Sequence, residues 1–551
     1  LAAPLAWTFW LLTVFFAPVL IPALRDLLSK PADMRLDTHL LQVGDATGRG
    51  LVRAAVNFAC LPYEAMFSLS AIALTLWRTL VTRRHLLQWN PSSEVERSLG
   101  SGMAAELRGM WGAPVLSLLI ALLVLHTNPA ALWVAGPLLA LWAVSPLLMA
   151  WLGRAPPQRS AQLSTLQLDF LGRLARRTWA FFEVNIREED HWLPPDNIQE
   201  HPSLVVARRT SPTNIGLSLL ANLGAWDFGY LQTAAVVQRT QRVFVTLDRM
   251  ERHRGHFYNW YDTETLAPLP PRYISTVDSG NLAGHLLTLR QGLLGLIDAP
   301  VLAPQTFAGL SHTLGVLREL QAAQGDTDPA WSAAIEAFDS RLALALATPP
   351  DTLRDALATV EALAALALPL AALSPPVDTY DPQEDAPAHW SARLIDACEQ
   401  ARQALAACLP PSVAAAGSMS AEDGVPSLRA LCAPGIAADV RTWACAQVHE
   451  LERLAHVAGQ FSLMEYGFLY DRARHLLSIG YDVDNRRLDQ GHYDLLASEA
   501  RLCSFVAVAQ GQLPQDTWFA LGRLLTEVDG DATLLSWSGS MFEYLMPQLV
   551  M

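Results

Sequence analysis

The sequence lacks the paired cysteines that build zinc sites and disulfide frameworks. Its six cysteines stand far apart, and no two form a CxxC pair. This spacing argues against both kinds of site. Their neighbours are apolar or alanine-rich, which predicts small buried thiols. The six positions are Cys60, Cys398, Cys408, Cys432, Cys445 and Cys503.

Other short chemical motifs are also missing. The sequence contains no HExxH, GxGxxG, Walker A or serine nucleophile elbow. Asp482, Asp484 and Asn485 suggest a calcium loop, but the glycine and glutamate of an EF-hand do not follow at their positions. We therefore expect neither a metal nor a cofactor. The net charge of −14 argues against a nucleic-acid partner, which requires a basic face.

Charge is absent from the first 24 residues, which are rich in Leu, Phe, Trp and Ala. Three further apolar segments follow, at residues 54–77, 109–126 and 129–153. A helix of about 20 apolar residues crosses a bilayer, so residues 1–153 are predicted to be a transmembrane region in contact with lipid. A signal peptide fits residues 1–24 poorly, because a basic leader and a small-residue cleavage site are missing. Buried core helices remain the alternative for some of the segments.

Basic residues predict the orientation of these segments, since cytoplasmic loops carry more Arg and Lys. Arginines gather after the last segment, from Arg154 to Arg177, and before the third, from Arg78 to Arg108. Both flanks are therefore expected on the cytoplasmic side. The first loop, which holds Arg25, Lys30 and further arginines, conflicts with this assignment.

The remaining chain is predicted to be helical. Apolar residues at helical spacing recur from about residue 160, separated by loops rich in Pro, Asp and Asn. Residues 300–455 differ, because they are rich in Ala and Leu and nearly free of aromatics. We expect this part to be a helical insertion or layer without chemistry of its own. The chain begins without Met, and we expect it to be a piece of a longer polypeptide.

The stretch from Ser478 to Met551 interleaves aromatic side chains with carboxylates. Flat rings stack on sugar rings, carboxylates bind hydroxyls, and one carboxylate can transfer a proton. The stretch therefore indicates a sugar site. A helical core with exposed acids is the alternative.

Glu499 is the candidate proton donor, because Leu495, Leu496, Leu502 and Phe505 surround it in sequence. Apolar surroundings raise the pKa of a carboxyl group and suit a general acid. An ion pair with Arg501 is the alternative.

Further residues are predicted to bind substrate through ring stacking or hydroxyl contacts. Turn capping is the alternative for Asp262 and Asp278. Glu543 is a candidate for a second carboxylate, in surroundings that fit a sugar subsite as well as a core. The predicted binding residues are Trp260, Tyr261, Asp262, Asp278, Ser279, Asn281, Asp482, Tyr493, Asp494, Trp537 and Glu543.

Several long motifs resemble the glucoamylase-like middle region of the cyclic β-1,2-glucan synthases. They include YDLLASEAR, LPQDTWFALGR, LLSWSGSMFEYLMPQLVM, WLPPDNIQEHP, RTSPTNIGLSLL and GHFYNWYDTETLAPLPPRYISTVDSGNLAGHL. The resemblance implies an all-α fold in which transmembrane helices precede an incomplete (α/α) toroid of helical hairpins. Residues 160–299 and 456–551 would form the toroid, with residues 300–455 as a helical insertion.

The resemblance also implies an activity. Such a domain closes a linear β-1,2-glucan into a ring by retaining transglycosylation, with Glu499 as acid/base and the partner carboxylate in a downstream motif. An endo-β-1,2-glucanase and a non-catalytic glucan-holding module remain alternatives. The implied partners are the glucan, membrane lipid, and neighbouring synthase and phosphorylase-like domains. The implied location is the bacterial inner membrane, with the soluble part in the cytoplasm.

Overall fold

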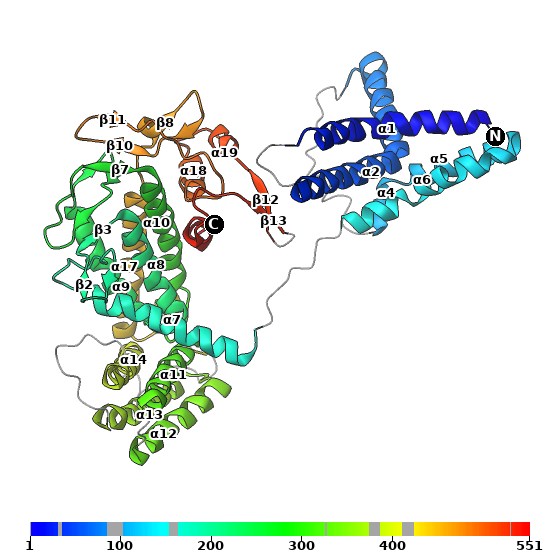
Figure 1. Cartoon of the computed structure of the whole chain (residues 1–551). Helices are drawn as coiled ribbons and strands as arrows, with labels where there is room; N and C mark the ends of the chain where they lie inside the picture. Colours follow the sequence, from blue (N-terminus) through cyan, green and yellow to red (C-terminus); the bar gives the residue numbers. More distant parts are fainter. Residues whose placement is uncertain are drawn as a thin grey trace. The chain divides into compact units, whose positions relative to one another are not determined.

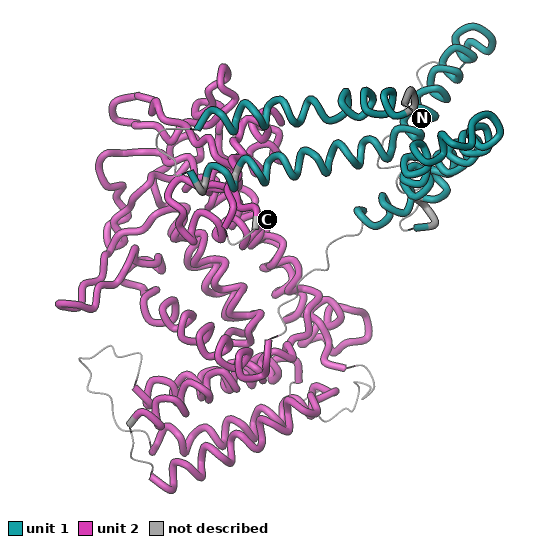
Figure 2. Tube along the Cα trace, turned by 45° about the vertical axis from the view of Figure 1, so that its right-hand side comes forward, with its two compact units in different colours: residues 1–161 teal, residues 162–551 magenta. Residues whose placement is uncertain are grey.

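A computed structural model describes eight stretches of the chain, and its contacts divide the chain into two compact units. The units are residues 1–161 and 162–551 (Figure 2), and each is described by itself. The described residues are 2–30, 36–84, 103–153, 163–324, 328–373, 386–409, 424–528 and 531–551.

The first unit is made of apolar helices. They are α1 (Ala2–Leu28), α2 (Leu36–Trp77), η1 (Arg78–Thr82), α4 (Met103–Gly109), α5 (Gly112–Thr127), η2 (Pro129–Ala131) and α6 (Leu132–Leu152). Large side chains such as Trp7 and Trp133 point outward, with exposed fractions of 77% and 88%. By length and composition, the helices over residues 5–28, 39–82 and 129–152 could cross a membrane. The second candidate is therefore much longer than the predicted segment, and α5 is shorter than a full span.

The second unit is mainly helical (Figure 1), which confirms the predicted all-α class. Its helices are α7 (Thr165–Asn185), α8 (Pro212–Asp227), α9 (Thr233–Arg249), α10 (Thr276–Leu296), α11 (Gln305–Gln324), α12 (Pro329–Ala347), α13 (Leu353–Leu373), α14 (Pro387–Cys408), α16 (Leu428–Leu431), α17 (Ala438–Phe461), η3 (Gly467–Leu469), α18 (Ala500–Ala509), α19 (Asp516–Ala520), α20 (Met541–Leu545) and η4 (Met546–Leu549).

Short strands join some of the loops between these helices. They are β1 (Ile198–Gln199), β2 (Val205–Val206), β3 (Arg209–Thr210), β4 (Arg252–His253), β5 (His256–Phe257), β6 (Tyr261–Asp262), β7 (Tyr273–Ser275), β8 (Tyr470–Asp471), β9 (Leu476–Leu477), β10 (Gly480–Asp482), β11 (Arg487–Leu488), β12 (Leu525–Val528) and β13 (Asp531–Leu534). All of the pairs are antiparallel, and β10 lies between β7 and β11. The pairing of Ser275 with Gly480 holds the start of α10 against the loop that leads toward α18.

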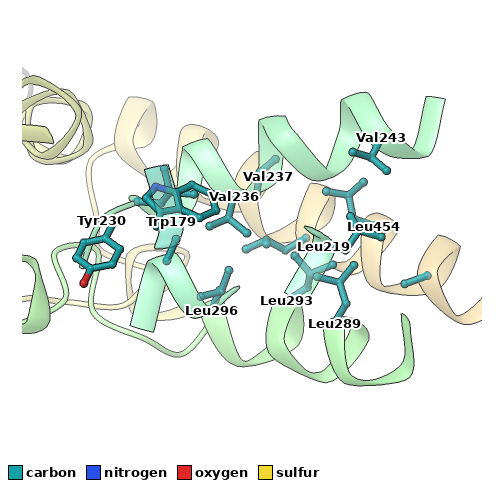
Figure 3. Packing of buried hydrophobic residues seen from close by; sticks show 14 of the residues in the cluster. Trp179, Leu219, Tyr230, Val236, Val237, Val243, Leu289, Leu293, Leu296 and Leu454 are labelled. Atoms are coloured by element: carbon teal, nitrogen blue, oxygen red, sulfur yellow. The ribbon is translucent and has the colours of Figure 1, made fainter. Parts of the chain in front are cut away.

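Helix α10 lies at the centre of the unit and packs against α8, α17 and α18. Its leucines meet side chains of α8, α9 and α17 in the core, among them Leu219, Val236 and Leu454 (Figure 3). Burying a leucine stabilises the fold by roughly 1.5–3 kcal/mol. This side-by-side packing of helices agrees with the predicted all-α fold.

Two glycines bring α10 and α18 unusually close. A Cβ at Gly280 would overlap Cys503, and a Cβ at Gly284 would press on Leu502. Because larger residues would force the helices apart, these glycines set the position of the first turn of α18 against α10.

Residues 300–455, where the sequence predicted a helical insertion or layer, hold α11 to α14, α16 and most of α17, and α17 packs against α10. Helix α11 packs against α7 and α14, and α13 packs between α12 and α14. Helix α13 is also apolar enough to span a membrane, but Leu363 and Leu370 on it are completely buried against these neighbours.

Candidate functional site

Glu499 stands at the N-terminal end of α18 and does not cap it. Its carboxylate turns toward α10, where Asn281 Nδ2 donates a hydrogen bond to Oε2 at 2.7 Å. Arg501, the alternative partner, donates instead to the backbone oxygen of Tyr544 at 2.9 Å. Among the residues that the structure describes, Glu499 forms no ion pair. The carboxylate therefore remains available for chemistry.

A chain of hydrogen bonds joins Glu499 to a second carboxylate, that of Asp278. Asn281 Nδ2 also donates to Thr213 Oγ1 at 3.0 Å, and Thr213 Oγ1 donates to Asp278 Oδ1 at 2.6 Å. The two carboxyl groups consequently lie closer together than about 9.5 Å, the upper limit for the carboxylate pairs of inverting glycosidases. No sequence pattern pairs them, because they are 221 positions apart along the chain.

The surroundings raise the pKa of Glu499 to about 6. Burial is the main cause, the hydrogen bond from Asn281 opposes it, and the charges of Asp278 and Glu543 raise the pKa further. Burial also raises the pKa of Asp278. Glu499 can therefore hold a proton near neutral pH, as a general acid must.

Trp260 is linked to Asp278 through Asn259. With the Asn259 amide oriented to satisfy both neighbours, its nitrogen donates to Asp278 Oδ2 at 3.0 Å and its oxygen accepts from Trp260 Nε1 at 3.1 Å. The Arg209 guanidinium covers one face of the indole, 4.8 Å from the ring centre. Trp260 is half-buried.

Tyr493 also belongs to this neighbourhood. Burial raises the pKa of its hydroxyl, and the charges of Glu499 and Asp278 raise it further. The residue is half-buried, whereas the neighbouring Asp494 is exposed. Tyr493 is therefore close enough to both carboxyl groups to feel their charges.

Tyr261 and Ser279, two of the predicted binding residues, lie instead in the core. The Tyr261 hydroxyl donates to the backbone oxygen of Glu251, and the ring is completely buried. Ser279 Oγ donates to the backbone oxygen of Ser275 at 2.8 Å and contacts His256 Nδ1. Neither side chain presents a surface to a ligand; both support the loop and helix that carry the site.

Asp262 and Asp482 both cap turns. For Asp262, turn capping was the alternative to substrate binding. Asp262 Oδ1 accepts hydrogen bonds from the backbone nitrogens of Glu264 and Thr265. Asp482 accepts from the backbone and side chain of Asn485 at 2.9 and 2.7 Å. The hydrogen bonds lower the pKa of both carboxyl groups, outweighing burial at Asp262.

The Glu543 side chain takes part in capping the N-terminus of α20. Its carboxylate accepts from Ser538 Oγ at 2.6 Å and from the Ser540 backbone nitrogen at 3.2 Å, within the capping box of α20. Burial would raise the pKa of Glu543, but the hydrogen bonds dominate and lower it to about 2. Trp537, on the preceding turn, is exposed. Glu543 is thus held in its ionised form.

Thr213, Asn259 and Arg209 were absent from the predicted site. Thr213 follows the capping Ser211 at the start of α8, and Asn259 precedes Trp260 in its loop. Both lie in segments that carry the family resemblance, which was the available clue. Their contacts join residues that are far apart in the sequence, so only the folded structure shows them.

Two cavities of the second unit lie elsewhere. One of about 740 Å³ is bordered by α7 and α8, and one of about 800 Å³ by α9 and α17. Neither is lined by a predicted site residue. Within the described ranges, no group of three or more His, Cys, Asp or Glu side chains could hold a metal ion.

Comparison with known proteins confirms the predicted resemblance. No family model matches the chain. Over 98% of its length the chain is 33% identical to the cyclic β-(1,2)-glucan synthase NdvB of Rhizobium meliloti, and the match covers 18% of that protein. The chain therefore spans about a fifth of the length of this relative.

Two solved structures are distant neighbours, both described as glucoamylase-like. The protein from Bacteroides fragilis is 20% identical, with 25% of this chain and 33% of that chain covered and a TM-score of 0.20. The protein from Bacteroides caccae is 12% identical, with 53% and 95% covered and the same TM-score.

Proposed function

We propose that this chain, a homologue of a segment of the cyclic β-(1,2)-glucan synthases, acts on β-1,2-glucan by retaining transglycosylation that closes the chain into a ring. Glu499 is the acid/base of this reaction. The observation that carries the proposal is the position of Glu499, half-buried, uncommitted to any cation and joined to Asp278 through Asn281 and Thr213.

Glu499 donates its proton to the oxygen of the glycosidic bond as that bond breaks. The resulting carboxylate then takes a proton from the attacking hydroxyl of the acceptor sugar. Asn281 stabilises the carboxylate by its hydrogen bond, and the nearby charge of Asp278 favours the return of the proton.

A retaining mechanism also needs a carboxylate nucleophile about 5 Å from the acid. Asp278 accepts hydrogen bonds at both oxygens, from Thr213 and Asn259, and Glu543 is used by the α20 cap. We therefore assign the nucleophile to the downstream motif that the family resemblance implies. Asp278 acts on Glu499 as a positioning residue.

Trp260 and Tyr493 form the sugar subsites next to Glu499. Stacking on one sugar ring uses the Trp260 face that Arg209 leaves open. Asp494 and Trp537 are exposed and extend the binding surface.

The first unit anchors the chain in the inner membrane, and the second unit lies in the cytoplasm. The outward-facing tryptophans and the three long apolar helices support the anchor. The orientation rests on the arginine cluster, of which Arg154 and Arg159 lie outside the described residues. A reporter fused after residue 160 should report a cytoplasmic position, and a periplasmic result would overturn the orientation.

The activity is tested by incubating linear β-1,2-glucan with the chain extended through the downstream motif, followed by chromatography of the products. Cyclic products support ring closure. Shortened linear products identify a hydrolase, and binding without turnover identifies a glucan-holding module. Full activity of the extended Glu499→Gln variant would remove Glu499 from the mechanism.

A further inference from the structure

Helix α7 begins with a row of apolar side chains that the structure leaves uncovered. Leu166, Phe170 and Leu174 follow one another at a spacing of four residues, so they share one face of the helix. Their exposed fractions are 80%, 56% and 49%. A continuous apolar patch is rare on the surface of a soluble protein and marks an interaction site. We call these three residues the α7 row.

Leu174 belongs both to the α7 row and to the lining of the apolar cavity bordered by α7 and α8, which we call the α7–α8 groove. The groove has a volume of about 740 Å³, and the exposed ring of Phe228 also lines it. This volume is within the roughly 300–1,000 Å³ of ligand pockets. The α7 row therefore leads into a space large enough for a ligand.

The lining of the groove favours an apolar ligand. Its polar side chains Tyr230 and Thr178 are already hydrogen-bonded within the protein. The Tyr230 hydroxyl donates to the Gly172 oxygen at 3.1 Å, and Thr178 Oγ1 donates to the Leu174 oxygen at 2.8 Å. Most of the remaining lining is made of Leu, Ala and aromatic side chains, which gain free energy by covering apolar surface.

The charged side chains next to the α7 row already have partners. Arg173 pairs with Asp169 and, at 2.7 Å, with Glu319, and Arg177 pairs with Glu319 at 3.5 Å. Attraction to anionic lipid headgroups comes from clusters of basic residues near the membrane surface. Because carboxylates offset the basic groups here, we expect the partner of this surface to bind through its apolar part.

The place of α7 in the chain indicates which apolar partner can reach it. Helix α6 ends at Leu152 and α7 begins at Thr165. An extended chain spans at most about 3.6 Å per residue, so residues 153–164 hold the start of α7 within on the order of 45 Å of the end of α6. The helix over residues 129–152 could cross a membrane. Tethering makes a second contact with the same bilayer intramolecular, so even a weak contact is populated.

We propose that the α7–α8 groove binds an acyl chain of a membrane lipid while the α7 row lies on the bilayer surface. The inference rests on the proposed function, which places the first unit in the membrane. It goes further by assigning a lipid contact to the second unit.

The test replaces Phe170 or Phe228 by the photoreactive benzoylphenylalanine in the full chain, reconstituted in phosphatidylcholine vesicles. After irradiation, mass spectrometry detects lipid joined to the tryptic peptides, residues 160–173 and 210–239. Phe519, an exposed ring on α19 outside the groove, is the matched control. We expect adducts at the two test positions to exceed those at Phe519 by about tenfold or more, because an interfacial helix buries its apolar face in the acyl region.

A third position separates this inference from the membrane anchor. Benzoylphenylalanine in place of Trp133, an exposed side chain on α6, reports on the first unit. Adducts at Trp133 without adducts at Phe170 and Phe228 would overturn the inference and leave the anchor intact. An adduct at Phe170 without one at Phe228 would overturn the assignment of the groove. No adduct at any of the three positions would overturn both the anchor and the inference.

A pair of substitutions tests the apolar nature of the contact. Leu174→Glu places a charge where the α7 row meets the groove and should lower the adduct yield at Phe228 about tenfold, because a carboxylate is costly to bring into hydrocarbon. Leu344→Glu changes a similarly exposed leucine on α12 and should leave the yield unchanged. Equal losses in both variants would contradict the proposed contact.

The lipid headgroup and the oligomeric state complete the test. Adduct yields should agree within about twofold between phosphatidylcholine and phosphatidylglycerol vesicles, since the contact does not depend on anionic headgroups. A requirement for phosphatidylglycerol would assign the contact to headgroups and overturn the inference. Joined chains on a denaturing gel, in place of lipid adducts, would assign the surface to a second copy of the chain and overturn it as well.

Discussion

Two helix starts in the last 55 residues each carry a glutamate, and the structure uses them differently. At α20, the Glu543 carboxylate is enclosed by serine hydroxyls and backbone nitrogens, and its pKa falls to about 2. At α18, Glu499 makes no capping bond, faces α10, and has its pKa raised to about 6. The same residue type in similar aromatic and apolar sequence is permanently ionised in one place and able to titrate in the other.

The difference follows from which donors surround each carboxylate. Glu543 meets several donors within its own turn, so the ionised form is satisfied locally. Glu499 meets one donor, Asn281, and lies near the charge of Asp278. A carboxylate at a helix start therefore becomes a candidate acid when the tertiary fold, and not the cap, supplies its partners.

The largest expected effect comes from exchanging the two glutamates for glutamine, one at a time. In the extended chain, Glu499→Gln should lower turnover of linear β-1,2-glucan by about 10²–10⁴-fold, because glutamine keeps the shape but has no acidic proton. Glu543→Gln should leave turnover within a few-fold of the wild type. Equal losses in both variants would erase the distinction between the two sites.

The pH dependence of turnover tests the neighbours of Glu499. The protonated acid is needed, so activity should decline as the pH rises through about 6. Asp278→Asn removes a nearby charge, lowers the pKa of Glu499 and moves this decline to lower pH. Asn281→Leu removes the donor to the carboxylate, raises the pKa and moves the decline to higher pH. Shifts in the same direction in both variants would contradict the assigned roles.

Ring stacking should have a smaller effect, seen in binding. Trp260→Ala and Tyr493→Ala should each weaken the binding of β-1,2-glucan by about 1 kcal/mol, roughly fivefold, measured by calorimetry on the full chain. Phe228→Ala is the control, because this exposed ring borders the cavity between α7 and α8. Loss of affinity in the control alone would place the glucan in that cavity.

The smallest effect concerns the α20 cap. Glu543→Gln should lower the free energy of unfolding by about 0.5–1 kcal/mol. The folded pKa of Glu543 lies below the ordinary value of 4.5, so its contribution is present above pH 4.5 and is lost as the pH falls toward 2. The stability difference between this variant and the wild type, followed by thermal unfolding, should therefore vanish in acid. A difference that grows on acidification would show that the cap is not the cause.

The opposite pH dependence is expected at Glu499. Its folded pKa is raised, so ionisation destabilises the fold, and this loss appears as the pH rises from 4.5 through about 6. Glu499→Gln should therefore gain stability relative to the wild type above pH 6. The stability of the Glu499→Gln and Glu543→Gln variants, relative to the wild type, should change with pH in opposite directions. Each variant therefore serves as a control for the other.

The sequence predicted the helical class and the apolar first unit because both follow from local periodicity and composition. It also selected Glu499, whose apolar neighbours along the chain are matched by burial in the fold. Tyr261 and Ser279 carry suitable side chains for a sugar, but only the packing of β6 and α10 shows that they are buried. The pairing of Asp278 with Glu499 arises from helix packing, which no spacing in the sequence encodes.

The central claim is that Glu499 carries a proton near neutral pH, and its pKa can be measured directly. Infrared difference spectra of the full chain, recorded from pH 3 to 8 with Glu499→Gln as the reference, isolate the carboxyl band of this residue. We predict a titration midpoint near 6, lowered by Asp278→Asn and raised by Asn281→Leu. A midpoint at or below 4.5, unaffected by either substitution, would contradict the account.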